Sequence, residues 1–181
     1  MDAPPPASER WVETSREPVF RAFGRGLDQV GYLLPDGTEA TFYISVARPT
    51  VSIVALTREQ RVIMVEQYRP GPGDLLRELP GGFIDENETP STAAERELLE
   101  ETGYRGTVEL HATCYLDAYS SARKYCFTAT DCVLASAPSD LDPEVTRVVL
   151  VTIDDLRRAL REGRMTDVDS GLLGLQHLGL L

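Results

Sequence analysis

The chain has 181 residues, of which 42% are hydrophobic and 26% charged, so it suits one folded domain with a substantial core. It carries 29 acidic and 18 basic residues, a formal net charge of −11. This excludes general binding to nucleic acid, which needs a basic surface. No apolar run approaches the roughly 20 residues of a membrane helix, so no membrane partner is expected.

The N-terminal residues 1–8 are proline-rich and polar, and we expect a disordered tail there. They lack the basic start and apolar stretch of a signal peptide. The cysteines form no CxxC pair and are interpreted as small buried residues in a reducing cytoplasm. Cys126 and Cys132 lie an even number of positions apart, so they are expected to share one face of a strand.

Alternating or β-branched segments predict strands along most of the chain. Turns are expected at 35–38 and 58–60, the second closing a central hairpin. The predicted strands are residues 19–23, 28–34, 40–47, 50–57, 61–68, 75–79, 108–116, 124–134 and 146–153.

A helix is predicted over residues 90–102, with Thr89 as N-cap, Pro90 at the first helical position and Gly103 as the stop signal. A second helix is predicted near 154–162. Thr166 is expected to cap a last helix with an apolar stripe of Leu172, Leu175 and Leu178. Many strands with few helices indicate an α/β class of α+β mixed type, a mixed sheet packed between helices.

The helix over 90–102 presents three carboxylates within one turn, Glu97, Glu100 and Glu101. Such a cluster repels itself unless cations occupy it, and carboxylate oxygens are ligands that Mg²⁺ prefers. Arg96 can pair with Glu100 four residues on. Two upstream glycines, Gly81 and Gly82, would let backbone carbonyls approach an ion closely. A merely solvated glutamate-rich face is the alternative. The chain offers no catalytic triad, which disfavours most nucleophilic mechanisms.

The spacing decides between these readings. Gly82 is followed after five residues by Glu88, and after seven more by Arg96-Glu97-Leu98-Leu99-Glu100-Glu101-Thr102-Gly103. This resembles the Nudix box at every defining position, with Tyr104 where an aliphatic residue is usual. Seven specified residues give a chance agreement of roughly one in ten million per start position.

The resemblance implies a Nudix-type α/β/α sandwich around a mixed sheet with an N-terminal antiparallel strand extension. It implies a single domain over 9–181, with the extension at 9–48 and a catalytic core at 49–181. Glu97, Glu100, Glu101 and the Gly81 carbonyl would hold Mg²⁺, with Mn²⁺ as the alternative metal. Glu100 and Glu101 would act in catalysis and Arg96 would orient the glutamates. Glu88 would brace the loop into the helix.

Outside the box, residues 65–70 and 77–82 resemble the ADP-ribose pyrophosphatase (ADP-sugar) branch. By that resemblance Arg69 contacts substrate phosphate and Glu78 lies near substrate or metal. The branch also implies a homodimer built by the N-terminal strands, with an aromatic residue stacked on the base. Trp11, Phe42 and Tyr43 are candidates for this stacking, although packing is an alternative role for each.

Residues 116–125 depart from that branch, whose loop after the box carries a proline and a water-activating glutamate. Asp117 is the only acid in this stretch. Arg123 and Lys124 make it basic, so they either grip a distal phosphate or face solvent. Glu144 is a second candidate for the missing acid.

The predicted activity is Mg²⁺-dependent hydrolysis of the pyrophosphate in a nucleoside diphosphate linked to another group. An ADP-sugar such as ADP-ribose is the expected substrate, giving a nucleoside monophosphate and a sugar phosphate. The alternatives are another Nudix specificity, for a nucleoside triphosphate, a dinucleotide or NADH, or a nucleotide-sensing Nudix domain without activity. The sequence does not name the base, the sugar, the general base or the number of metal ions.

Overall fold

The computed structural model describes residues 9–136 and 145–181, which form two compact units. The first unit is the described part of residues 1–48 together with Tyr115–Ala122, and the second is Pro49–Cys114 with Arg123–Leu181. The tail expected at 1–8 and the candidate acid Glu144 lie outside the described residues. The single domain over 9–181 therefore stays a prediction.

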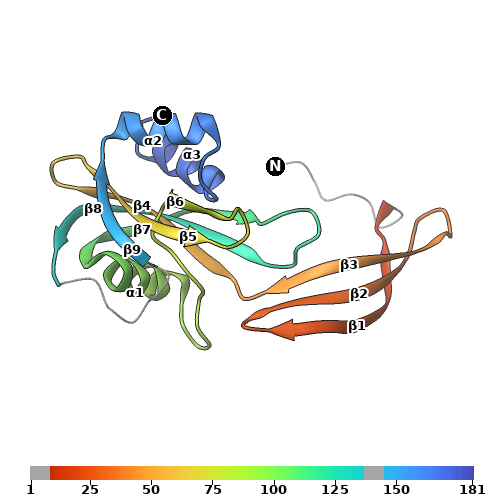
Figure 1. Cartoon of the computed structure of the whole chain (residues 1–181). Helices are drawn as coiled ribbons and strands as arrows, with labels where there is room; N and C mark the ends of the chain where they lie inside the picture. The colour runs from red at the N-terminus through yellow and green to blue at the C-terminus, as the bar shows by residue number, and fades with distance from the viewer. Residues whose placement is uncertain (1–8, 137–144) are drawn as a thin grey trace. The chain divides into compact units, whose positions relative to one another are not determined.

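The first unit is a three-stranded antiparallel sheet of β1 (Val12–Ala22), β2 (Arg25–Leu33) and β3 (Glu39–Ala47), seen at the red end of the chain in Figure 1. β1 begins seven positions before the predicted residue 19, because pairing with β2 continues back to Val12. Its side chains are almost all exposed, so an apolar pattern could not reveal its start. The segment Tyr115–Ala122 joins this unit through β3, where the Ser45 amide donates to the Tyr119 carbonyl at 2.7 Å.

The second unit contains a six-stranded mixed sheet. Its strands are β4 (Thr50–Thr57), β5 (Val62–Arg69), β6 (Asp74–Glu78), β7 (Tyr104–Tyr115), β8 (Arg123–Leu134) and β9 (Val145–Val151). The order is β6-β5-β4-β8-β7, with β9 paired to β5. The sheet is mixed because β4 runs parallel to β8 and antiparallel to β5. The predicted hairpin of β4 and β5 is confirmed.

Helices cover both faces of this sheet, α1 (Pro90–Thr102) on one and α2 (Ile153–Glu162) with α3 (Val168–His177) on the other (Figure 1). Alternate residues of β4 supply the two cores: Ile53 packs with Leu98 of α1, and Val54 packs with Leu156 of α2 and Leu175 of α3. The predicted mixed sheet between helices is confirmed. No helix in the described ranges is long and apolar enough to cross a membrane.

Two expectations about packing were wrong. Cys126 contacts Ser170 of α3, whereas Cys132 packs in the α1 core. An irregularity in the β4–β8 register puts one extra residue into β8 at Asp131, whose φ is +54°, and reverses the alternation of faces. On α3, Leu175 and Leu178 pack on the core as predicted, but Leu172 is 39% exposed. The buried face includes Gly174 instead, where an added Cβ would lie 2.5 Å from Val54 Cγ2.

Candidate metal and substrate site

The helix α1 begins and ends at the predicted residues. Thr89 accepts a bond from the Thr92 amide at 3.2 Å, Pro90 opens the helix, and Gly103 ends it in the left-handed conformation at φ +76°. Leu98 and Ala94 bury the helix against the sheet. The cap signals and the buried face together fix which side of α1 carries its glutamates.

Arg96, in the middle of this helix, is the centre of an ionic cluster. Its Nε and Nη2 each donate to Glu88 at 2.9 Å, and Nη1 donates to Glu97 at 2.8 Å and to Glu100 at 3.1 Å. Nη2 also bonds the Phe83 carbonyl at 3.0 Å. The guanidinium holds the pKa of Glu88 below its usual value, mainly through hydrogen bonding, and the pKa of Arg96 is raised in return. Arg96 therefore orients three carboxylates and the preceding loop.

The two glycines bring the loop before α1 into contact with its glutamates. The Gly81 amide donates to Glu101 Oε2 at 2.9 Å, and Glu101 is buried. A Cβ on Gly82 would lie 2.5 Å from Glu97 Cδ and 2.7 Å from its Oε2. Any side chain at position 82 would have to displace that carboxylate. The Pro80 and Gly82 carbonyls accept from β4 amides at 3.0 and 2.9 Å, and the Gly81 carbonyl between them takes part in neither bond.

The chemistry of these donors fits Mg²⁺, which prefers carboxylate and carbonyl oxygens. Three carboxylates, those of Glu88, Glu97 and Glu100, contact one guanidinium. The Glu101 carboxylate accepts from the Gly81 amide, and Gly82 leaves the Glu97 carboxylate against bare backbone. Within residues 9–136 and 145–181, however, no three acidic, histidine or cysteine side chains are gathered closely enough to hold a metal ion. The donor types are present, and three of the carboxylates are engaged by Arg96.

Glu78 lies at the end of β6, three residues before Gly81, and is completely buried. Its Oε2 accepts from Gln67 Nε2 at 3.1 Å and from Arg69 Nε at 2.5 Å, and its Oε1 accepts from the Thr166 hydroxyl. The structure thus brings together Arg69 and Glu78, two of the residues predicted to meet substrate. It also shows that Thr166 does not cap α3, whose N-cap is Asp167.

Lys124 is neither in a loop nor facing solvent. It lies in β8, is buried, and bonds Asp169 at 2.6 Å and Asp167 at 3.4 Å. The two aspartates engage its ammonium group, so the expected solvent-facing position was wrong for this residue, and contact with a phosphate stays a prediction. Arg123 is the first residue of β8 and is half-buried.

Trp11 belongs to the first unit, where it lies in an aromatic cluster. Its ring centroid is 5.2 Å from that of Phe42 and 5.9 Å from that of Tyr32, and Phe42 stacks on Tyr119 at 6.3 Å. Trp11 is nevertheless 48% exposed. Tyr43 takes no part in these ring contacts and bonds Gln29 through its hydroxyl at 3.2 Å. The Trp11 ring therefore packs against Phe42 and Tyr32, and about half of the residue's surface stays exposed.

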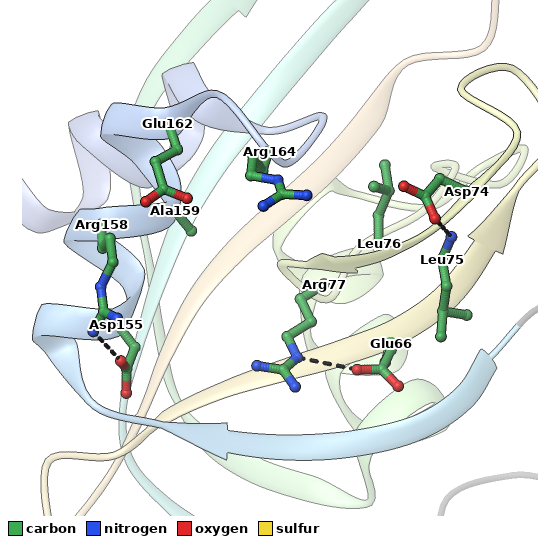
Figure 2. A pocket seen from close by; sticks show the side chains of 10 residues that line it. All are labelled: Glu66, Asp74, Leu75, Leu76, Arg77, Asp155, Arg158, Ala159, Glu162 and Arg164. Carbon is green, nitrogen blue, oxygen red and sulfur yellow. Dashed lines mark hydrogen bonds and ion pairs between the residues drawn. The ribbon is translucent and has the colours of Figure 1, made fainter.

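A cavity of about 490 Å³ lies among β5, β6 and α2 (Figure 2), and no residue of the box lines it. Its carboxylates pair with neighbouring arginines: Glu66 with Arg77 at 3.0 Å, and Asp155 with Arg158 at 2.6 Å. Hydrogen bonds from Arg147 and then from Arg77 hold the pKa of Glu66 below its usual value. None of the predicted site residues lies in this cavity.

Sequence reasoning missed Gln67, Asp167 and Asp169, and it misread Thr166 and Lys124. All of these contacts join positions far apart in the chain, such as Thr166 with Glu78. The one local signal was the pair of aspartates flanking Val168, and an acidic helix start explains that pair equally well.

Comparisons with known proteins bear on the family and the fold of this chain. The NUDIX domain family matches residues 46–169. The putative nudix hydrolase 2 of Caenorhabditis elegans is 42% identical over 98 residues, which are 51% of this chain and 44% of that protein. The ADP-ribose pyrophosphatase of Bacillus subtilis is 28% identical over 150 residues, 81% of this chain and 80% of that protein.

A solved structure described as an ADP compounds hydrolase has the same fold, with a TM-score of 0.77 and 22% identity over 95% of this chain and 97% of that one. The chain spans less than half the length of the worm relative. The family match covers more than half of this chain and includes β4, the box and α1. This chain therefore belongs to the Nudix hydrolase family.

Proposed function

We propose that this chain hydrolyses the pyrophosphate of a nucleoside diphosphate linked to another group, with an ADP-sugar such as ADP-ribose as its substrate. The observation that carries the proposal is the Arg96 cluster packed against Gly81 and Gly82. Arg96 orients three carboxylates, and Gly82 leaves space for one of them, that of Glu97. Carboxylates held in this way can bind divalent cations, which in turn bind phosphate.

In the reaction a water oxygen forms a bond to one phosphorus, the bridging P–O bond breaks, and a nucleoside monophosphate and a sugar phosphate leave. Mg²⁺, when bound, supplies positive charge to the diphosphate and lowers the pKa of water. Glu97, Glu101 and the Gly81 carbonyl would hold it, with Glu100 as a further ligand or as acceptor of the water proton. The Glu100 side chain is 50% exposed, which leaves it accessible to a water.

Arg69 would bind the substrate diphosphate. Its Nε is held by Glu78, and its side chain is 31% exposed, so the guanidinium is both oriented and accessible. Arginine is suited to phosphate because its planar fork can donate two bonds at once. The name of the Bacillus subtilis relative supports ADP-ribose as the first substrate to test. Arg123 is a second candidate for contact with a distal phosphate.

The test is phosphate release with Mg²⁺ and a coupled phosphatase. The panel is ADP-ribose, ADP-glucose, GDP-mannose, UDP-glucose, NADH, diadenosine polyphosphates and nucleoside triphosphates. We expect an ADP-sugar to be cleaved fastest and EDTA to abolish turnover. Faster cleavage of a triphosphate, of a dinucleotide or of NADH would replace the proposed specificity with another one. Ligand binding without turnover on any compound would indicate a sensing domain instead.

We also propose a cytoplasmic homodimer assembled through the first unit. Support comes from β1 and the turn after it, where Val19 and Phe20 are more than half exposed and Phe23 is 96% exposed, an unusual number of bare apolar side chains for one strand. Light scattering should give twice the mass of the 20.0 kDa chain. Phe20→Asp should halve that mass, and a monomeric wild-type protein would contradict the proposal.

A further inference from the structure

The segment between α2 and α3 is bound to the sheet at two places. The Thr166 hydroxyl donates to Glu78 of β6, and the Lys124 ammonium of β8 donates to Asp167 and Asp169. Thr166 and Asp167 precede α3, and Asp169 lies in its first turn. Side chains from two strands thus converge on three residues of one short segment.

Glu78 is the point where this segment meets Arg69. Both Glu78 oxygens are occupied, Oε2 by Gln67 and Arg69 and Oε1 by Thr166. A buried carboxylate is stable only when donors satisfy it, and its orientation follows the donors it has. Without the Thr166 hydroxyl, Oε1 would lose its only donor found within residues 9–136 and 145–181, and Glu78 would be held through Oε2 alone.

The Lys124 charge keeps this acidic segment in position. Burial acts to lower the pKa of Lys124, but hydrogen bonding to Asp169 and the charges of both aspartates outweigh it, and the pKa is raised. Burial raises the pKa of Asp167, and the nearby Glu78 charge adds to this while Lys124 opposes it. Glu78 and Asp167 therefore repel each other, and Lys124 is the cation that offsets the repulsion.

We propose that Thr166, Asp167, Asp169 and Lys124 are positioning residues that hold Glu78, and through Glu78 the guanidinium plane of Arg69, in the orientation that binds the substrate diphosphate. This inference rests on the proposed function. A bidentate phosphate contact depends on the plane of the guanidinium, and the Glu78 bond at Nε constrains that plane. The segment acts through Arg69 and has no contact of its own with substrate.

The decisive comparison is Thr166→Val with Thr166→Ser. Valine keeps the shape of threonine and removes the hydroxyl, whereas serine keeps the hydroxyl. For ADP-ribose hydrolysis we expect Thr166→Val to raise KM about tenfold with kcat changed less than about twofold, the pattern of lost binding rather than lost chemistry. Thr166→Ser should restore the wild-type KM. Inorganic pyrophosphate, tested as a competitive inhibitor, should likewise bind Thr166→Val about tenfold more weakly than it binds the wild-type protein.

Thr152→Val is the matched control, because Thr152 caps α2 through bonds confined to Asp155 and its own helix. It should lower the melting temperature without raising KM. Asp169→Asn, which weakens the hold of Lys124 on the segment, should raise KM about threefold and tests the second anchor without burying an unpaired cation.

Equal KM values for wild type, Thr166→Val and Asp169→Asn would overturn the inference while leaving the proposed function intact. A KM raised as much by Thr152→Val would also overturn it, because general loosening would then explain the effect. If the wild-type protein cleaves no compound of the panel, the proposed function fails and this inference fails with it.

Discussion

The Glu97 carboxylate lies directly against the α-carbon of Gly82, in the space that a side chain would otherwise fill. Glu97 is also bonded to Arg96 at 2.8 Å, so a side chain at position 82 would have to displace a carboxylate that is already held in an ion pair. The two residues are fifteen positions apart in the sequence but are in contact in the folded protein.

Gly82→Ala should therefore impair the site more than the fold. The new Cβ would displace the Glu97 carboxylate, and we expect kcat to fall at least about 10-fold, since a displacement of about 1 Å costs that much or more. Gly71→Ala is the matched control, because an added Cβ there meets nothing within 4 Å. Steady-state kinetics and melting curves of both variants check this, and normal kcat in Gly82→Ala would count against the Glu97 assignment.

Glu101→Gln should abolish most activity and leave the fold intact. The glutamine oxygen can still accept the Gly81 amide, whereas the negative charge is lost, so we expect kcat to fall at least about 10²-fold. Glu95→Gln changes an exposed glutamate of the same helix and should have no effect. Near-normal turnover of Glu101→Gln at saturating Mg²⁺ would contradict the role proposed for this helix face.

Arg96→Lys should destabilise the protein and reduce activity together. Lysine cannot reproduce a fork that contacts Glu88, Glu97, Glu100 and the Phe83 carbonyl, and losing charged hydrogen bonds costs about 1–3 kcal/mol in the free energy of unfolding. Arg158→Lys is the control, because its pair with Asp155 is largely exposed and contributes little. Urea unfolding of the two variants measures the difference, and equal losses would refute the central role of Arg96.

Trp11 is the only tryptophan of the chain and is 48% exposed, so its fluorescence reports on this ring alone. If it stacks on the base, ADP-ribose should quench the emission saturably, and ribose 5-phosphate, which has no base, should not. Trp11→Phe keeps a ring and should raise KM less than Trp11→Ala. Unchanged fluorescence at saturating ADP-ribose would assign Trp11 to packing.

Stability should decline in mild acid because of His111. Burial, and then the charge of His177 stacked at 5.1 Å, lower the pKa of His111 from 6.5, while Glu109 opposes the shift. As the pH falls below 6.5, the unfolded chain binds a proton that the folded protein resists, so the free energy of unfolding decreases.

His111→Phe should flatten this decline above roughly pH 5, in unfolding curves recorded between roughly pH 8 and pH 3. The loss linked to Glu88, whose pKa is lowered from 4.5, begins at lower pH and serves as an internal reference in both proteins. The same slope in wild type and variant would rule out His111 as the cause.

Features that depend on neighbours within about one helical turn could be predicted from the amino-acid sequence. The bounds of α1 follow from Thr89, Pro90 and Gly103, and the Arg96–Glu100 pair follows from their spacing. The β4–β5 hairpin followed from two β-branched runs and a short polar turn. These outcomes need only local backbone chemistry, which the sequence displays directly.

Tertiary structure alone decided the surroundings of Glu78 and Lys124. Thr166 reaches Glu78 across 88 positions, and Lys124 reaches Asp169 across 45. Similarly, the extra residue at Asp131 that reverses the face of Cys132 is visible only in the pairing with β4. The partner of a buried charged group depends on which elements pack beside it in the folded protein. The local sequence around the charged group does not contain that information.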